Sequence, residues 1–214
     1  MKTHLIIGLG RFGQHMTRKL CELGNEVLAV DRNEERVNKV LSFATKAQIG
    51  DATNEQFIES LGVGSFDTCV VAIGDDFQSS LEATFLLKDY GAKYVVARAS
   101  REVHVKFLLR CGADDVIYPE RETALRAAVK YSSDSVFDYI ELTPDYSIYE
   151  ITPPESWIGK TILDLAIRTN YHISILATKQ DGVLSPLPHP DYRFDKDQRL
   201  VIMGGNEDVQ KFIK

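Results

Sequence analysis

The stretch LIIGLGRFG, residues 5–13, leads from an apolar run through a Gly-x-Gly-x-x-Gly pattern into a helical pattern. Glycines at this spacing suit a tight turn at Gly8, the approach of backbone to a pyrophosphate at Gly10, and close packing of helix on strand at Gly13. The free N–H groups at the start of the helix would face an anion. A glycine-rich turn without a ligand can carry the same pattern, so its interpretation depends on the residues of the next strand.

A second strand-like run, Glu26 to Val30, ends in Asp31, whose carboxylate would accept both hydroxyls of a ribose. Together with the glycines, it predicts a nucleotide or dinucleotide site. Asp31 suits the ribose of ATP, ADP, NAD and NADH equally, but it disfavours NADP because the 2′-phosphate would meet a carboxylate. We expect loss of the Asp31 carboxylate to weaken nucleotide binding and to leave the fold intact.

Length and charge limit the classes of protein to which the chain can belong. Its 214 residues suffice for a medium domain and a small one, and its net charge of −6, without any Lys/Arg-rich run, argues against a nucleic-acid partner. The apolar runs are too short for the roughly 18 residues of a membrane-spanning helix, and Met1 to His4 leads straight into the first strand without a signal peptide. Cys21, Cys69 and Cys111 lie far apart in apolar contexts, which predicts reduced core residues of a cytoplasmic protein.

Apolar runs alternate with helical patterns as far as Glu120, which is typical of βα units. The pattern predicts an α/β fold with a doubly wound, six-stranded parallel sheet of Rossmann-like type. The expected strands are the run that begins at Leu5, then Glu26–Val30, Ala47–Gly50, Cys69–Ile73, Tyr94–Ala97 and Val116–Tyr118. Ligands of such sheets bind at the carboxyl ends of the strands. At that edge we expect Gly8 to Gly13, Asp31, Asp51, Gly74, Arg98 and Glu120.

The pattern changes after Glu120, and we place the domain boundary between residues 1–135 and 136–214. A helix that runs to about Ser133 carries Leu125 and Val129, which have no evident partner once the sheet is complete, so we expect them to pack between protomers. The remainder predicts a small α+β lobe. Its expected strands are Tyr139–Leu142, Ser147–Ile151, Ile173–Thr178 and Arg199–Met203, and its expected helices are Gly159–Arg168 and Glu207–Ile213.

The sequence contains no catalytic pattern. The five histidines include no i,i+4 pair, the cysteines have no CxxC spacing, and no GxSxG motif is present. A small NAD-dependent oxidoreductase is the alternative hypothesis, but it needs an acid or base beside the nicotinamide, for which His104 and Tyr118 are weak candidates. A redox-sensing transcription regulator would need a basic DNA-reading helix, which the charge balance opposes. We therefore predict that the protein is not an enzyme.

Several stretches together resemble a known family. They are IIGLGRFG (6–13), VLAVD (27–31), IGDAT (49–53), VVAIGDD (70–76) and RCGADDVIYPE (110–120). With them the chain resembles the cytoplasmic regulator of K⁺ conductance (RCK) domain, and more narrowly the regulatory subunit of bacterial Trk/Ktr potassium-uptake systems. The last stretch has no part in a generic dinucleotide fold, which makes the resemblance specific. It spans essentially the whole chain, although the C-terminal half matches less distinctively.

The resemblance implies a nucleotide-sensing gating subunit that binds ATP/ADP or NAD(H). The glycines and Arg11 would hold phosphates, Arg32 would lie beside the adenine, and Asp51 and Ala52 would border the base. Glu120 would lie near the phosphates or a divalent cation across a dimer. The ligand-binding residues implied in this way are Gly8, Gly10, Arg11, Phe12, Gly13, Asp31, Arg32, Asp51, Ala52, Ile73, Gly74, Arg98 and Glu120.

The resemblance also implies partners and a second ligand. Subunits of this kind form homodimers and octameric rings on the cytoplasmic face of a separate integral-membrane K⁺ transporter or channel, so the protein would be cytoplasmic and peripheral to the inner face of the cell membrane. Some members bind cyclic di-AMP at a dimer interface of the C-terminal lobe. Residues 167–172, with Arg168 and Tyr171, and residues 187–190 lie where that site would be.

Overall fold

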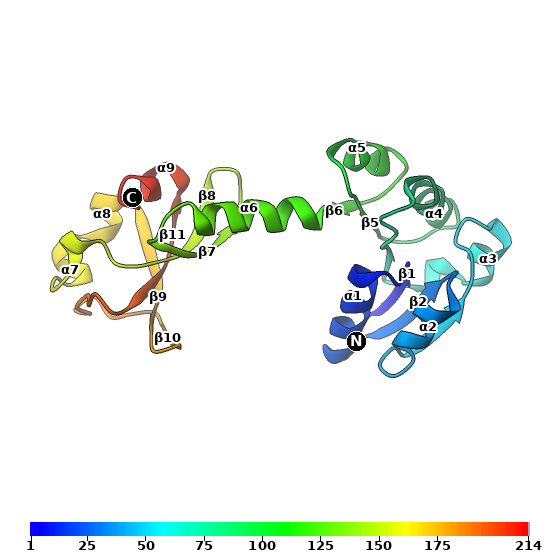
Figure 1. Cartoon of the computed structure of the whole chain (residues 1–214), viewed down its shortest axis with the longest axis horizontal. Helices are drawn as coiled ribbons and strands as arrows, with labels where there is room; N and C mark the ends of the chain where they lie inside the picture. Colours follow the sequence, from blue (N-terminus) through cyan, green and yellow to red (C-terminus); the bar gives the residue numbers. More distant parts are fainter. Residues whose placement is uncertain (214) are drawn as a thin grey trace. The chain divides into compact units, whose positions relative to one another are not determined.

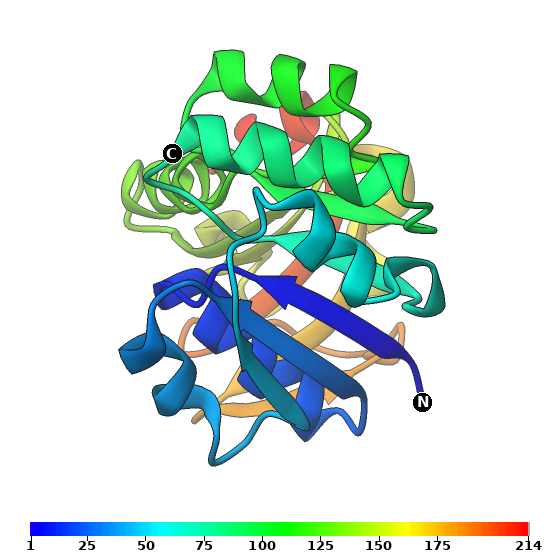
Figure 2. The same ribbon diagram turned by 90° about the vertical axis from the view of Figure 1, so that its right-hand side faces the viewer.

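A parallel sheet in the order β3-β2-β1-β4-β5-β6 forms the first half of the chain in our computed structural model, which describes residues 1–213. Its strands are β1 (Thr3–Ile7), β2 (Glu26–Asp31), β3 (Lys46–Ile49), β4 (Thr68–Val71), β5 (Val95–Arg98) and β6 (Asp115–Ile117). Strand β1 pairs with β2 on one side, as Figure 2 shows in blue, and with β4 on the other. The predicted doubly wound sheet is thereby confirmed, and the strand order reverses beside β1, where such sheets bind ligands.

Helices cover both faces of this sheet, because its strands carry apolar side chains on both sides (Figure 1). One face packs Ile6, Ala29 and Val70 with apolar residues of helices α1 (Arg11–Glu22) and α2 (Glu34–Val40). The other face packs against the remaining helices of the unit. These are α3 (Glu55–Ser60), the 3₁₀ turn η1 (Val63–Ser65), α4 (Phe77–Asp89) and α5 (Glu102–Arg110).

Side-chain caps fix where three of these helices begin. The side chains of Asn33, Asn54 and Asp76 accept hydrogen bonds from backbone N–H groups in the first turns of α2, α3 and α4. Such caps satisfy N–H groups that a helix start otherwise leaves unpaired. Each cap follows the end of a strand, so it also fixes the loop at the carboxyl edge of the sheet.

The second half forms an antiparallel sheet in the order β10-β9-β11-β8-β7, which confirms the predicted small α+β lobe. Two details differ from the sequence prediction: β10 was not expected, and the helix expected over 159–168 is interrupted at Ala166, whose φ of 44° is left-handed. Trp157 and Phe194 are fully enclosed in the core. The elements are β7 (Val136–Glu141), β8 (Tyr146–Ile151), η2 (Glu155–Trp157), α7 (Ile162–Leu165), α8 (Ile167–Tyr171), β9 (Ile173–Gln180), β10 (Val183–Pro186), β11 (Arg199–Gly205) and α9 (Asn206–Gln210).

Helix α6 (Pro119–Tyr131) connects the two halves (Figure 1). The chain divides into two compact units after Glu120. The sequence analysis placed the domain boundary after residue 135, and that boundary stays a prediction. Val129 packs against the hydrophobic core of the second unit. The expectation that Val129 lacks a partner within the chain is therefore wrong, while Leu125 is 44% exposed, and packing of α6 between protomers stays a prediction.

Candidate functional site

A cavity of about 530 Å³ opens at the carboxyl ends of the parallel strands. The structure brings together there every residue that we expected to bind a ligand, except Gly13. The lining residues are Ile7, Gly8, Gly10, Arg11, Phe12, Asp31, Arg32, Arg36, Gly50, Asp51, Ala52, Thr53, Ala72, Ile73, Gly74, Asp75, Asp76, Ser79, Arg98, Pro119 and Glu120. We call this cavity the edge pocket.

The three glycines of the first turn have different surroundings. Gly8 has a φ of +95°, which favours glycine, and the backbone of Ile73 lies close to it. A Cβ at Gly13 would lie 1.9 Å from the carbonyl oxygen of Gly8, so this glycine lets α1 pack on the turn. At Gly10, no atom of the described residues would lie within 4 Å of a Cβ, which leaves free space beside the backbone. The turn is thus able to receive a bulky group at Gly10.

Asp31 is 5% exposed and holds the turn together. Its Oδ2 accepts a 2.6 Å hydrogen bond from the backbone N–H of Leu9, and its Oδ1 accepts one of 2.8 Å from Asn33. Arg36 Nη1 lies 3.6 Å from Oδ2. Two backbone N–H groups depend on this carboxylate, so its removal should lower the stability of the fold as well as weaken ligand binding. A carboxylate has about four lone-pair positions, so both oxygens retain capacity for ribose hydroxyls.

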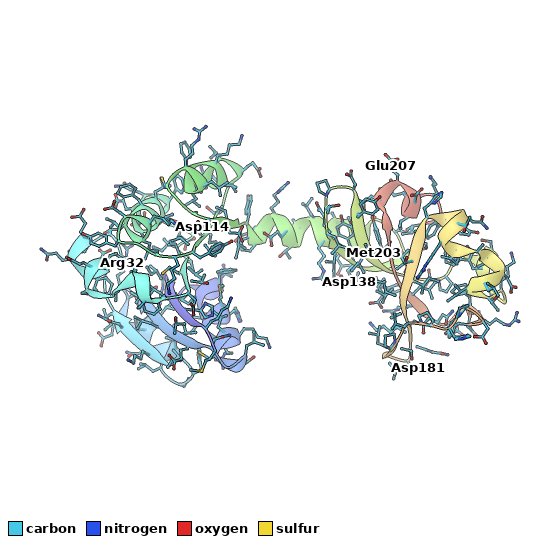
Figure 3. All side chains as sticks on the ribbon, turned by 180° about the vertical axis from the view of Figure 1, so that it is seen from behind. Arg32, Asp114, Asp138, Asp181, Met203 and Glu207 are labelled. Atoms are coloured by element: carbon cyan, nitrogen blue, oxygen red, sulfur yellow. The ribbon has the colours of Figure 1, made fainter. Side chains whose placement is uncertain are left out.

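The edge pocket contains four arginines, three of which form ion pairs. Arg11, at the start of α1, is the exception, since within residues 1–213 it has no ion-pair partner. It is an exposed cation at a helix N-terminus, and both features attract an anion. The three pairs are Arg32–Asp76 at 3.7 Å, Arg36–Asp31 at 3.6 Å and Arg98–Glu120 at 2.5 Å, and Figure 3 labels Arg32 at the end of β2.

Arg98 and Glu120 come from the ends of β5 and β6. The guanidinium of Arg98 lies against Gly74, where a Cβ would be 2.3 Å from Nη1, and its Cζ lies 5.8 Å from the ring centroid of Phe12. Burial raises the pKa of Glu120, but hydrogen bonds from its own backbone and from Arg98, with the charges of Arg98 and Arg11, outweigh burial and lower the pKa overall. Glu120 is therefore a carboxylate at neutral pH.

Asp51 has a well-defined position in the pocket wall. Hydrogen bonds from the backbone N–H and the hydroxyl of Thr53 lower its pKa, and the charge of Arg32 adds to them. Sequence reasoning missed Arg36 and Asp76, although the spacing of Asp76 and Ser79 is that of a helix cap and could have located Asp76. Nothing local identified Arg36, because its partner Asp31 lies on another element.

His104, which was considered as a catalytic residue, has contacts that give it a structural role, and the possible metal ligands form no cluster among the described residues. His104 is 9% exposed and stacks on Phe77 at 3.6 Å between ring centroids, outside the residues that line the edge pocket. Within residues 1–213, no group of three or more His, Cys, Asp or Glu side chains could hold a metal ion. A cation held by Glu120 across a dimer stays a prediction.

The segment considered for cyclic di-AMP lies in the second unit. Tyr171 contacts Trp157 edge-on, with ring centroids 4.8 Å apart, and Phe212 at 5.9 Å. Its ring is thus partly buried against the core, whereas Leu187 is 84% exposed. Cyclic di-AMP binding stays a prediction.

Comparison with known proteins identifies the family. A TrkA-N domain matches residues 4–119 and a TrkA-C domain matches residues 146–214. Two Bacillus subtilis (strain 168) proteins match nearly end to end: Ktr system potassium uptake protein A at 39% identity, over 99% of this chain and 95% of that protein, and Ktr system potassium uptake protein C at 37%, over 100% and 96%. The chain belongs to the Trk/Ktr family of potassium-uptake proteins.

A solved relative shows that the Trk/Ktr chain has the fold of an RCK domain. The GsuK RCK domain superposes with a TM-score of 0.69 at 19% identity, over 99% of this chain and 47% of that one. The resemblance drawn from sequence is confirmed, and these relatives give no support to the oxidoreductase alternative. In the described part of the chain, the helices are all too short or too polar to cross a membrane.

Proposed function

We propose that this chain is a nucleotide-sensing, non-enzymatic regulatory subunit that controls K⁺ uptake through a separate membrane transporter or channel subunit. The observation that carries the proposal is that Arg11 forms no ion pair within residues 1–213, while the other arginines of the pocket do. An exposed cation at the start of a helix suits the phosphates of a nucleotide. Family membership supports the link to K⁺ uptake.

The pocket residues suit an adenine nucleotide or dinucleotide. Asp31 would accept hydrogen bonds from the ribose hydroxyls. The backbone near Gly10 and the side chain of Arg11 would hold phosphates, and Arg32 and Asp51 would border the base. A GsuK channel of similar fold, with a TM-score of 0.70 at 18% identity over 97% of this chain, is known bound to NAD, and another GsuK structure is bound to ADP. ATP/ADP and NAD(H) are therefore the ligands to test first.

Arg11 is our candidate for the group that distinguishes ATP from ADP. A ligand shifts a two-state protein only by its difference in affinity for the two states, so opposite outputs require a group that contacts the third phosphate in one state. The exposed guanidinium of Arg11 is free to reach outward, and in a two-fold dimer two copies would approach each other's nucleotides. We expect the protein to act as a homodimer within an octameric ring, at the cytoplasmic face of the membrane.

A ligand panel tests the binding half of this proposal. We expect thermal stabilisation by one of ATP, ADP, NAD or NADH, less by NADPH, with cyclic di-AMP as a separate arm; a ligand at 100 times its Kd adds about 2.7 kcal/mol. Stabilisation by none of the four adenine ligands at millimolar concentration would contradict it. Conversion of NADH in the presence of small carbonyl compounds would contradict the non-enzymatic assignment.

The variant Arg11→Ala tests the switch. It should remove most of the preference for ATP over ADP and abolish ATP-dependent K⁺ flux through the partner, while ADP binding falls only modestly. Lys19→Ala is the control, because it removes one positive charge from the same helix, outside the residues that line the pocket. Equal losses of ATP and ADP affinity in Arg11→Ala would make Arg11 a simple phosphate anchor.

A further inference from the structure

The ion pair between Arg98 and Glu120 joins the edge pocket to the first turn of α6. Arg98 is the last residue of β5 and its side chain is 19% exposed, whereas Glu120 is the second residue of α6 and its side chain is 56% exposed. Both line the pocket. A change at this pair therefore affects both the ligand site and the beginning of the helix.

The pair satisfies the guanidinium of Arg98 only in part. Nη2 donates to Oε1 of Glu120, but the neighbouring Nε is buried and, among the described residues, has no hydrogen-bond partner. Nε and one terminal nitrogen form an edge of the guanidinium with two parallel N–H donors. A carboxylate or a phosphate can accept a hydrogen bond from each donor, one on each of two oxygens. Glu120 uses one oxygen, so a bidentate oxyanion would satisfy a donor that this pair leaves unmet.

The remainder of α6 is tied to the second unit. Arg126 donates two hydrogen bonds to Asp138 of β7, at 2.8 and 2.6 Å, and Val129 packs on the core of that unit; Figure 3 labels Asp138. The compact units divide directly after Glu120. Glu120 thus contacts Arg98 within the first unit, directly before the helix continues into the second.

We propose that the Arg98–Glu120 pair is a latch that the phosphates of a bound nucleotide open. A phosphate takes the donor edge of Arg98, Glu120 is released, and the first turn of α6 loses its ion pair with β5. The latch rests on the proposed nucleotide site, and it adds a route from that site to the helix. Coupling of this kind is reciprocal, so a closed latch must weaken nucleotide binding by the factor with which the nucleotide opens it.

Calorimetric titration of the full chain with ADP tests the competition. The buffer contains EDTA, so that Glu120 cannot contribute by holding a cation. We expect Glu120→Gln to bind ADP about fivefold or more tightly than wild type, since the nucleotide no longer displaces a charged competitor, and Arg98→Gln to bind at least about tenfold more weakly. Glu35→Gln is the matched control: it removes a carboxylate paired with Lys39 on the surface of α2, outside the residues that line the pocket, and should leave the affinity unchanged.

Hydrogen–deuterium exchange without nucleotide tests the latch independently of binding. Both Glu120→Gln and Arg98→Gln should speed exchange in the second turn of α6, whose N–H groups bond to carbonyls of the first turn, as ADP should in wild type. If wild type binds no nucleotide while the variants still loosen α6, the proposed function fails and the structural contact stands. If wild type binds ADP but Glu120→Gln binds equally or more weakly, or if neither variant changes α6, the latch is refuted while the nucleotide site stands.

Discussion

Replacing Gly13 by Ala sets helix propensity against packing at the turn between β1 and α1. A Cβ at Gly13 would lie 1.9 Å from the carbonyl oxygen of Gly8 and 3.0 Å from its carbonyl carbon. Favourable contacts between nonbonded heavy atoms lie near 3.5–4.0 Å, so the helix and the turn would have to separate by roughly 1.5 Å. Both partners in this contact are backbone, which side-chain rotation cannot relieve.

The two effects have opposite signs, and their sizes decide the outcome. Alanine is favoured over glycine inside a helix by about 1 kcal/mol. Overpacking typically costs about 1–3 kcal/mol, and backbone displacement places this site near the upper end. We therefore expect Gly13→Ala to lose about 2 kcal/mol of unfolding free energy, which lowers the thermal midpoint by roughly 4–8 °C.

Thermal unfolding followed by circular dichroism, with Gly10→Ala as the matched control, provides the assay. Gly10 has a φ of −65°, and no atom of the described residues lies within 4 Å of a Cβ there, so this variant should melt at or slightly above the wild-type temperature. It should instead weaken ADP binding by about 10- to 100-fold, because the methyl group occupies space proposed for a phosphate. A Gly13→Ala protein as stable as wild type would refute the packing argument.

Three further predictions concern buried or paired groups. Asp31→Asn replaces an acceptor oxygen by a donor and leaves the N–H of Leu9 or Asn33 unpaired, so urea unfolding should show a loss of about 1–3 kcal/mol, and an unchanged midpoint would contradict this role. Burial raises the pKa of Cys69 to about 12, whereas the unfolded thiol titrates near 9.0, so the unfolding free energy should fall as the pH rises above 9.0, and Cys69→Val should make that fall shallower. Arg126→Gln removes two hydrogen bonds to Asp138 from an exposed pair and should cost about 0.2–1 kcal/mol. The hydrogen bond from Arg126 is the main cause that lowers the pKa of Asp138, so the difference between variant and wild type should be present above the ordinary value of 3.8 and disappear as the pH falls through the depressed one.

The parallel sheet was predictable because its signals are local. A strand buried on both faces reads as a continuous apolar run, as in Cys69 to Val71, and a capping side chain such as Asn33 marks the next helix. The antiparallel lobe was less predictable. Every residue of strand β10 (Val183–Pro186) is exposed, so no alternation of buried and exposed side chains marks it in the sequence. Only its pairing with β9 makes it a strand.

Contacts between distant residues account for the errors about single side chains. Val129 was expected to need a partner protomer, but the second unit supplies a core that the helix pattern alone does not reveal. Asp31 was expected to serve only a ligand, yet its oxygens hold two backbone N–H groups, because the end of β2 adjoins the turn after β1. Tyr171 was placed where a cyclic di-AMP site would be, and only the structure shows that its ring packs edge-on against Trp157.

The sequence by itself determined the glycine turn, the Rossmann-like sheet, the family and many of the residues that line the edge pocket. It did so because strand runs, caps and glycine spacing depend on near neighbours, and because parallel strands bring all their carboxyl ends to one edge. Only the tertiary structure decided the pairing of the pocket's charges: Arg36 with Asp31, Arg98 with Glu120, and Arg11 without an ion pair among the described residues. These pairs depend on which side chains can reach one another across neighbouring loops. The spacing of residues along the chain does not specify that.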